Sequence, residues 1–127
     1  MREAFADVFA FQAEMGQRVG VCPEVPDAAT VALRRKLIEE EVAETLAAMR
    51  DADLVGVADG IADAIYVLIG TAIAYGIQLP DVWAEVHASN MRKVGGPVRE
   101  DGKRGKPDGW VGPDVAGVLR AWGWEGR

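Results

Sequence analysis

Acidic residues occur at spacings that could bring several carboxylates together on neighbouring helices. Residues 36–46 read KLIEEEVAETL and contain Glu40, Glu41 and Glu44. At 100° per residue, Glu41 and Glu44 fall in one narrow sector of a helix, and Glu40 lies at the edge of that sector. The sector adjoins the apolar wall of the same helix. We therefore expect these acids to lie beside the core.

A run of glutamates on a helix is often only a solvated face. Glu39 fits that description, because it shares the outer side of the helix with Arg35, Lys36 and Arg50. Ion pairs at such positions contribute only about 0.2–0.5 kcal/mol each. Glu39 is therefore left out of the candidate site.

A second acidic pair lies in the apolar segment ADGIADAIYVLIGTA, where Asp59 and Asp63 are one helical turn apart. Aspartate is a poor helix former, and a buried carboxylate without a partner is costly, so this pair needs compensation. Only Arg34 and Arg35 precede the acids closely enough to act as counter-ions. A divalent cation fits better, and hard oxygen ligands favour Mg²⁺, or Mn²⁺, over zinc.

Basic residues gather after the fourth predicted helix. Asn90 and Lys93 are three residues apart at its end, and the segment GGPVREDGKRGKPDGWVGP follows. This region adds Arg92, Arg99, Lys103, Arg104 and Lys106. An acidic metal pocket opposed by a basic loop suits a polyphosphate, since cations neutralise its oxygens and a loop can close over it. Taken alone, the lysines would more often belong to an ordinary soluble loop.

The composition excludes several other kinds of site. A single histidine and a single cysteine rule out multi-imidazole centres and internal disulfides. A net charge of -6 and a pI near 4.8 argue against a broad nucleic-acid interface. The N-terminus does not resemble a signal peptide, and the apolar run 64–77 is shorter than the roughly 20 residues of a membrane span. We expect a cytoplasmic protein without a membrane segment.

The elements that must position these residues are all helical. Apolar residues at three- and four-residue steps predict helices over 2–18, 31–50 and 54–75, a fourth from about Pro80, and a short one over 114–122. We expect one all-α domain over 1–127, with a four-helix core over 1–94 and a basic loop and short helix over 95–127. The third helix is apolar almost all round, so neighbouring helices or a second subunit must enclose it.

These motifs resemble the all-α nucleoside triphosphate pyrophosphohydrolases, which include MazG-like enzymes, dimeric dUTPases and phosphoribosyl-ATP pyrophosphohydrolase. The resemblance covers about residues 5–119. The sequence resembles above all the MazG-like proteins with dUTPase-like character. It rests on four segments: LIEEEVAETL, ADGIADAIYVLIGTA, HASNMRKV and DGKRGKPDGWVGPDV.

The resemblance implies magnesium-dependent hydrolysis of a nucleoside triphosphate to a monophosphate and pyrophosphate. Glu40 would serve as a metal ligand or as the base that activates water. The other metal ligands that the resemblance implies are Glu41, Glu44 and Asp63, and the implied substrate contacts are Asn90, Lys93 and Lys106. It also implies a homodimer or a tetramer built from dimers.

One departure bears on the metal site. The usual second motif is Glu-x-x-Asp, but Gly60 stands three residues before Asp63. Asp59 could reach the ion instead, and the number of metal ions stays open. Cleavage of phosphoribosyl-ATP and a non-catalytic nucleotide-binding module are the alternatives, and Gly60 favours the second of these. A base pocket could involve Phe9, Gln12 and Tyr66, or these residues could simply pack.

Overall fold

The structure, a computed structural model, describes residues 1–126, and in that range the regular elements are five α-helices. The helices are α1 (Arg2–Glu14), α2 (Ala28–Arg50), α3 (Leu54–Ala74), α4 (Leu79–Met91) and α5 (Val115–Ala121). The described residues contain no strand beyond an isolated bridge between Val98 and Arg104. The all-α prediction is confirmed.

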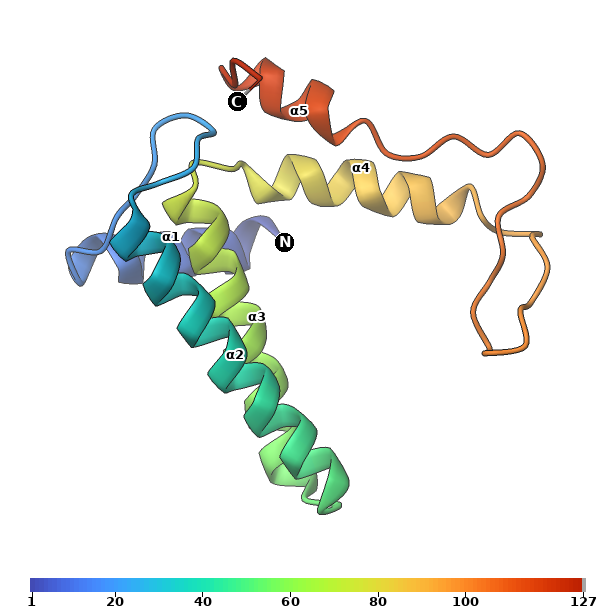
Figure 1. Cartoon of the computed structure of the whole chain (residues 1–127), viewed down its shortest axis with the longest axis horizontal. Helices are drawn as coiled ribbons and strands as arrows, with labels where there is room; N and C mark the ends of the chain where they lie inside the picture. Colours follow the sequence, from blue (N-terminus) through green and yellow to red (C-terminus); the bar gives the residue numbers. More distant parts are fainter. Residues whose placement is uncertain (127) are drawn as a thin grey trace.

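Helices α2 and α3 form a long antiparallel hairpin that projects away from the other helices (Figure 1). The carboxylate of Asp27 accepts hydrogen bonds from the backbone and hydroxyl of Thr30, so α2 begins three residues earlier than its apolar pattern indicates. Asp53 caps α3 in the same way, through the backbone N–H of Gly56 at 3.0 Å. The two caps fix the ends of the hairpin that carries the acidic residues.

Helix α1 crosses α3 near the C-terminal end of α3, and the buried core lies between them. Val8, Ile69 and Ile73 form this core. The prediction that the first helix continues to residue 18 is wrong: α1 ends at Glu14, and Gly16 follows with φ +68°. Glycine adopts that backbone conformation without a steric penalty, so it ends the helix.

Helix α4 runs away from the α3 terminus and carries the basic loop at its far end, while α5 returns along α4 (Figure 1). The basic loop is ordered: the backbone N–H of Gly105 donates to the carbonyl of Pro97, and that of Arg99 donates to the carbonyl of Lys103. At Gly96 an added Cβ would collide with the carbonyl of Gly105. Position 96 must therefore be glycine for the chain around it to approach the chain around Gly105 this closely.

The hairpin leaves many large apolar side chains exposed. On α3, Val55 is 80% exposed, and Ile61 and Ile65 are each 48% exposed, so neighbours within the described chain do not enclose this helix. By length and composition alone, the 21-residue α3 could cross a membrane, although a third of its most apolar window is buried. The complete helix is thus longer than the apolar run seen in the sequence. The described chain therefore leaves this apolar surface uncovered.

Candidate functional site

Acidic side chains from α2 and α3 gather around Glu41. One carboxylate oxygen of Glu41, Oε2, is buried and has no hydrogen-bond partner. Burial raises the pKa of Glu41 above its ordinary value, and neighbouring negative charges raise this pKa further. These charges belong to Glu44, Asp63, Glu40 and Asp59, in order of decreasing effect. The other four acids predicted from the sequence therefore act on Glu41 from both helices of the hairpin.

The basic residues nearby do not pair with Glu41, and only Glu40 at the edge of the group has a cation close by, Lys36 at 3.9 Å. Arg34 is only 5% exposed, but its guanidinium donates to neutral oxygens of α3, the hydroxyl of Thr71 and the carbonyl of Val67. Arg35 lies 3.9 Å from Glu39 on the outer face. Within residues 1–126, the ion pairs of the hairpin thus leave Glu41 without a cation.

The chemistry of the acidic group fits a hard divalent cation. All its candidate ligands are carboxylate oxygens, and the buried Oε2 of Glu41 needs a positive or hydrogen-bonding partner. In the described part of the chain, however, no three such side chains converge closely enough to form a ready-made metal site. The sequence prediction that Glu40, Glu41, Glu44, Asp59 and Asp63 hold magnesium therefore stays a prediction.

Gly60 explains how the two helices approach one another beside the acids. It is buried against Thr45 of α2, and a Cβ at Gly60 would lie 2.5 Å from the Thr45 hydroxyl oxygen and 3.0 Å from its Cα. A glutamate side chain would not fit there without a shift of the helices. The departure from the Glu-x-x-Asp pattern is therefore built into the packing, and Asp59 is the remaining acid one turn before Asp63.

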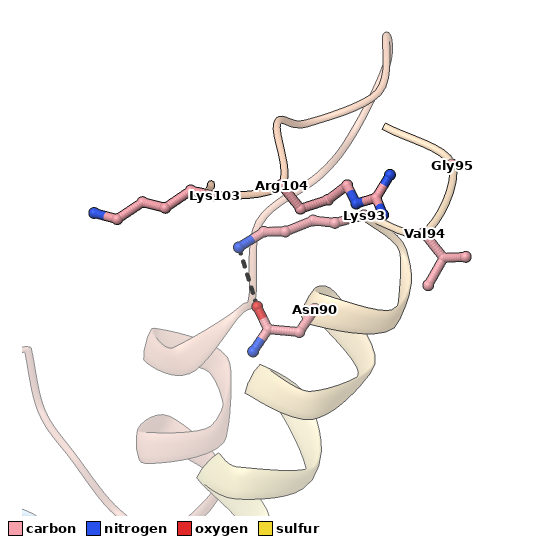
Figure 2. A pocket seen from close by; sticks show the side chains of 6 residues that line it. All are labelled: Asn90, Lys93, Val94, Gly95, Lys103 and Arg104. Carbon is pink, nitrogen blue, oxygen red and sulfur yellow. Dashed lines mark hydrogen bonds between the residues drawn. The ribbon is translucent and has the colours of Figure 1, made fainter. Parts of the chain in front are cut away.

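A separate cleft of about 480 Å³ at the end of α4 is lined by most of the predicted phosphate-binding residues, but not by Lys106. Its walls are Asn90, Lys93, Val94, Gly95, Lys103 and Arg104. The Lys93 ammonium donates to the side-chain oxygen of Asn90 at 3.0 Å, and Arg104 donates to the carbonyl of Gly96 at 2.8 Å. Figure 2 shows the Asn90–Lys93 pair, with the Lys103 side chain extending away from it. The cleft is positively charged and open to solvent.

The sequence reasoning missed Trp110. Its indole lies beneath two lysine ammonium groups, those of Lys93 at 5.2 Å and Lys106 at 4.7 Å from the ring centroid. The indole Nε1 also donates to the carbonyl of Ser89 in α4 at 2.9 Å. The sequence signal that could have pointed to Trp110 is the presence of a tryptophan in a basic segment rich in glycine and proline.

Two of the three residues considered for a base pocket, Gln12 and Tyr66, have structural contacts. Gln12 is 2% exposed, and its amide donates to the carbonyls of Arg18 and Gly70. Tyr66 packs edge-on against Phe11, with ring centroids 5.5 Å apart. Gln12 therefore ties α1 to α3, which favours the packing interpretation for this residue.

The acidic group and the basic cleft lie on different parts of the protomer. Helix α4 contacts α1, α3 and α5 but not α2. The basic loop projects well away from the α2–α3 hairpin (Figure 1). The described chain thus presents two half-sites, one suited to a cation and one suited to phosphate oxygens.

Comparison with known proteins identifies the family. The family model of phosphoribosyl-ATP pyrophosphohydrolase matches residues 8–90, about two thirds of the chain. The match spans the five acids and ends at Asn90, so Lys93, Lys103 and Lys106 lie beyond it. A search of curated proteins found no match. Members of this family are pyrophosphohydrolases that act on nucleotide-like substrates and typically depend on a divalent metal. The chain belongs to the phosphoribosyl-ATP pyrophosphohydrolase family, within the all-α MazG-like nucleoside triphosphate pyrophosphohydrolases.

Proposed function

We propose that the protein hydrolyses a nucleoside triphosphate to the monophosphate and pyrophosphate in a magnesium-dependent reaction, with dUTP as the first substrate to test. The observation that carries the proposal is the group of carboxylates around the unpartnered Glu41 Oε2, in a chain of a pyrophosphohydrolase family. Such a group is unfavourable by itself and becomes favourable when a cation joins it.

The acidic residues would divide two tasks between them. Glu41, Glu44 and Asp63 would hold magnesium, with Asp59 as a further ligand in place of the residue missing at Gly60. Bound magnesium would supply charge neutralisation at the phosphates and lower the pKa of a bound water. Glu40 is exposed at the edge of the group, with its carboxylate 3.9 Å from Lys36, and would accept the proton of the attacking water.

The basic cleft would bind the phosphate chain together with Lys106, which contacts the same Trp110 ring as Lys93 of the cleft. Asn90 offers an amide, and Lys93, Lys103 and Lys106 offer ammonium groups that neutralise phosphate oxygens. Because this cleft and the acidic group lie apart in one protomer, a complete site requires a second copy of the chain. We therefore propose a homodimer, or a tetramer built from dimers, in which the exposed apolar side of the hairpin is covered and the half-sites of two copies meet.

Phosphoribosyl-ATP is the second candidate substrate, because the matching family model is the one for its hydrolase. It carries the same phosphate chain, so the acidic and basic residues would keep their roles. A non-catalytic nucleotide-binding module is the third candidate, and the packing of Gly60 supports it by removing one family ligand.

Measuring pyrophosphate release from each nucleoside triphosphate, from dUTP and from phosphoribosyl-ATP distinguishes the three. The proposal expects magnesium-dependent release from at least one triphosphate, stopped by a chelator. Release from phosphoribosyl-ATP alone would select the second candidate. Nucleotide binding without any release would select the third.

A further inference from the structure

Trp110 joins the basic loop to α4 at the point where the proposed phosphate contacts are found. Helix α4 ends at Met91, and the carbonyls of Ala88, Asn90 and Met91 accept backbone N–H groups from the residues that follow. The carbonyl of Ser89 accepts the indole N–H of Trp110 instead, at 2.9 Å. Trp110 therefore completes the hydrogen bonding of the helix end, and it does so from 21 residues further along the chain.

The ring of the same residue holds two cations. The ammonium groups of Lys93 and Lys106 lie 5.2 and 4.7 Å from the ring centroid, within the distance of a cation–π contact. Neither lysine forms an ion pair with a carboxylate within residues 1–126. The indole thus contacts two positive charges without neutralising them.

We infer that Trp110 is a positioning residue, which holds Lys93 and Lys106 together so that both can contact one polyphosphate chain. The inference rests on the proposed function, since it assigns these lysines to the phosphates. An ammonium group over an aromatic ring keeps free N–H donors, and a phosphate oxygen attracts it more strongly than the ring does. Arranging both cations before the ligand arrives lowers the entropy cost of binding.

The test measures binding of inorganic tripolyphosphate by calorimetry in the presence of a chelator, so that the acidic metal group takes no part. Trp110→Leu removes both the ring and the N–H, and we expect it to weaken tripolyphosphate binding about tenfold. Trp110→Phe keeps a ring for the lysines but loses the bond to Ser89, so it should weaken binding less. Trp83→Leu is the matched control, because Trp83 lies on α4 with its side chain 56% exposed.

A spectroscopic measurement covers the case in which Trp110→Leu does not fold. When phosphates draw the lysines off the ring, the emission of Trp110 should change. Tripolyphosphate should therefore alter the tryptophan fluorescence of the wild type and of Trp83→Leu, and should leave that of Trp110→Phe nearly unchanged. Equal fluorescence changes in the wild type and Trp110→Phe would overturn the inference, as would equal affinities in the wild type and Trp110→Leu.

The proposed hydrolysis and the positioning role of Trp110 can be disproved independently of each other. A wild type that releases pyrophosphate, but whose tripolyphosphate affinity is indifferent to Trp110, overturns the positioning role alone. A wild type that binds tripolyphosphate in a Trp110-dependent way, but releases no pyrophosphate from any substrate, supports the positioning role and overturns hydrolysis.

Discussion

The acidic group on the hairpin is an arrangement of like charges that a bound cation would stabilise. Burial raises the pKa of Glu41 and the carboxylates around it raise this pKa further, so both disfavour its ionised form in the folded chain. In the unfolded chain these groups separate and the repulsion falls. Without a cation, the ionised acids at neutral pH therefore act against folding, and a bound cation should reverse their effect.

Replacing Glu41 with glutamine tests this reversal. In the presence of a chelator at neutral pH, we expect Glu41→Gln to raise the melting temperature by a few degrees, because one buried negative charge is gone. Added magnesium should raise the melting temperature of the wild type and have little effect on the variant. Thermal unfolding followed by circular dichroism measures both effects. A wild type that magnesium does not stabilise would contradict the role of Glu41 as a ligand.

Glu44 and Glu39 form a matched pair of acids on the same helix. Glu44 contributes to the charge around Glu41, whereas Glu39 faces Arg35 on the outer side. We expect Glu44→Ala to lower magnesium-dependent pyrophosphate release at least about a hundredfold, because it removes charge that holds the ion. Glu39→Ala should retain activity close to the wild type. Far-ultraviolet circular dichroism should show full helix content in both, and equal activities would remove Glu44 from the site.

Among the elements, the sequence predicts the helices well but not their tertiary arrangement. Helical periodicity and the acids at 40–44 and 59–63 foretell the hairpin and the grouping around Glu41, because neighbouring antiparallel helices bring these turns together. The contact between Gly60 and Thr45 could not be predicted from the sequence, because it depends on the rotation of the two helices about their axes. Trp83 shows the same limit, because the helical period of its segment does not reveal that this large side chain is mostly exposed. The separation of α4 from α2 is likewise a tertiary property.

The close packing of α2 and α3 at Gly60 makes a prediction about this position. Gly60→Ala should destabilise the protein by about 1–3 kcal/mol through overpacking, even though alanine is the better helix former. Because the nearest atom is the Thr45 hydroxyl oxygen, Thr45→Ala should relieve part of the loss when the two changes are combined. Urea unfolding of the wild type, the two single variants and the double variant gives the coupling energy between the two positions. Additive effects would show that the helices do not meet at these residues.

The cap of α2 gives the hairpin a dependence on acid. Hydrogen bonds from the Thr30 hydroxyl and backbone lower the pKa of Asp27 below its ordinary 3.8 in the folded protein. A carboxyl with a lowered pKa stabilises the fold above its unfolded pKa, and this contribution is lost as the pH falls through the folded pKa. Asp27→Asn keeps an oxygen acceptor without the charge. We expect its melting temperature to be below that of the wild type at about pH 6, and the two to converge only as the pH falls below the ordinary 3.8 and through the lowered folded pKa.

At the scale of the whole molecule, the chain exposes an apolar surface that the proposed dimer would cover. The hairpin projects from the other helices and exposes large apolar side chains on both its arms, such as Leu46, which is 58% exposed, and Val55. Exposed apolar surface of this extent is typical of a surface that another chain covers. The same assembly would bring the basic cleft of one copy to the acidic group of another. Catalysis would then require the oligomer.

Subunit mixing tests this composite site. Glu44→Ala damages the acidic half-site and Lys93→Ala damages the basic half-site, so each variant alone should be nearly inactive. If one site takes its two halves from different copies of a symmetric dimer, a mixed dimer contains one site with both defects and one intact site. After unfolding and refolding an equimolar mixture, about a quarter of the wild-type activity should return. If both halves come from the same copy, every site in every dimer carries a defect, and the mixture stays inactive. Light scattering on each sample establishes that dimers are present, and a monomeric wild type with full activity would refute the shared site directly.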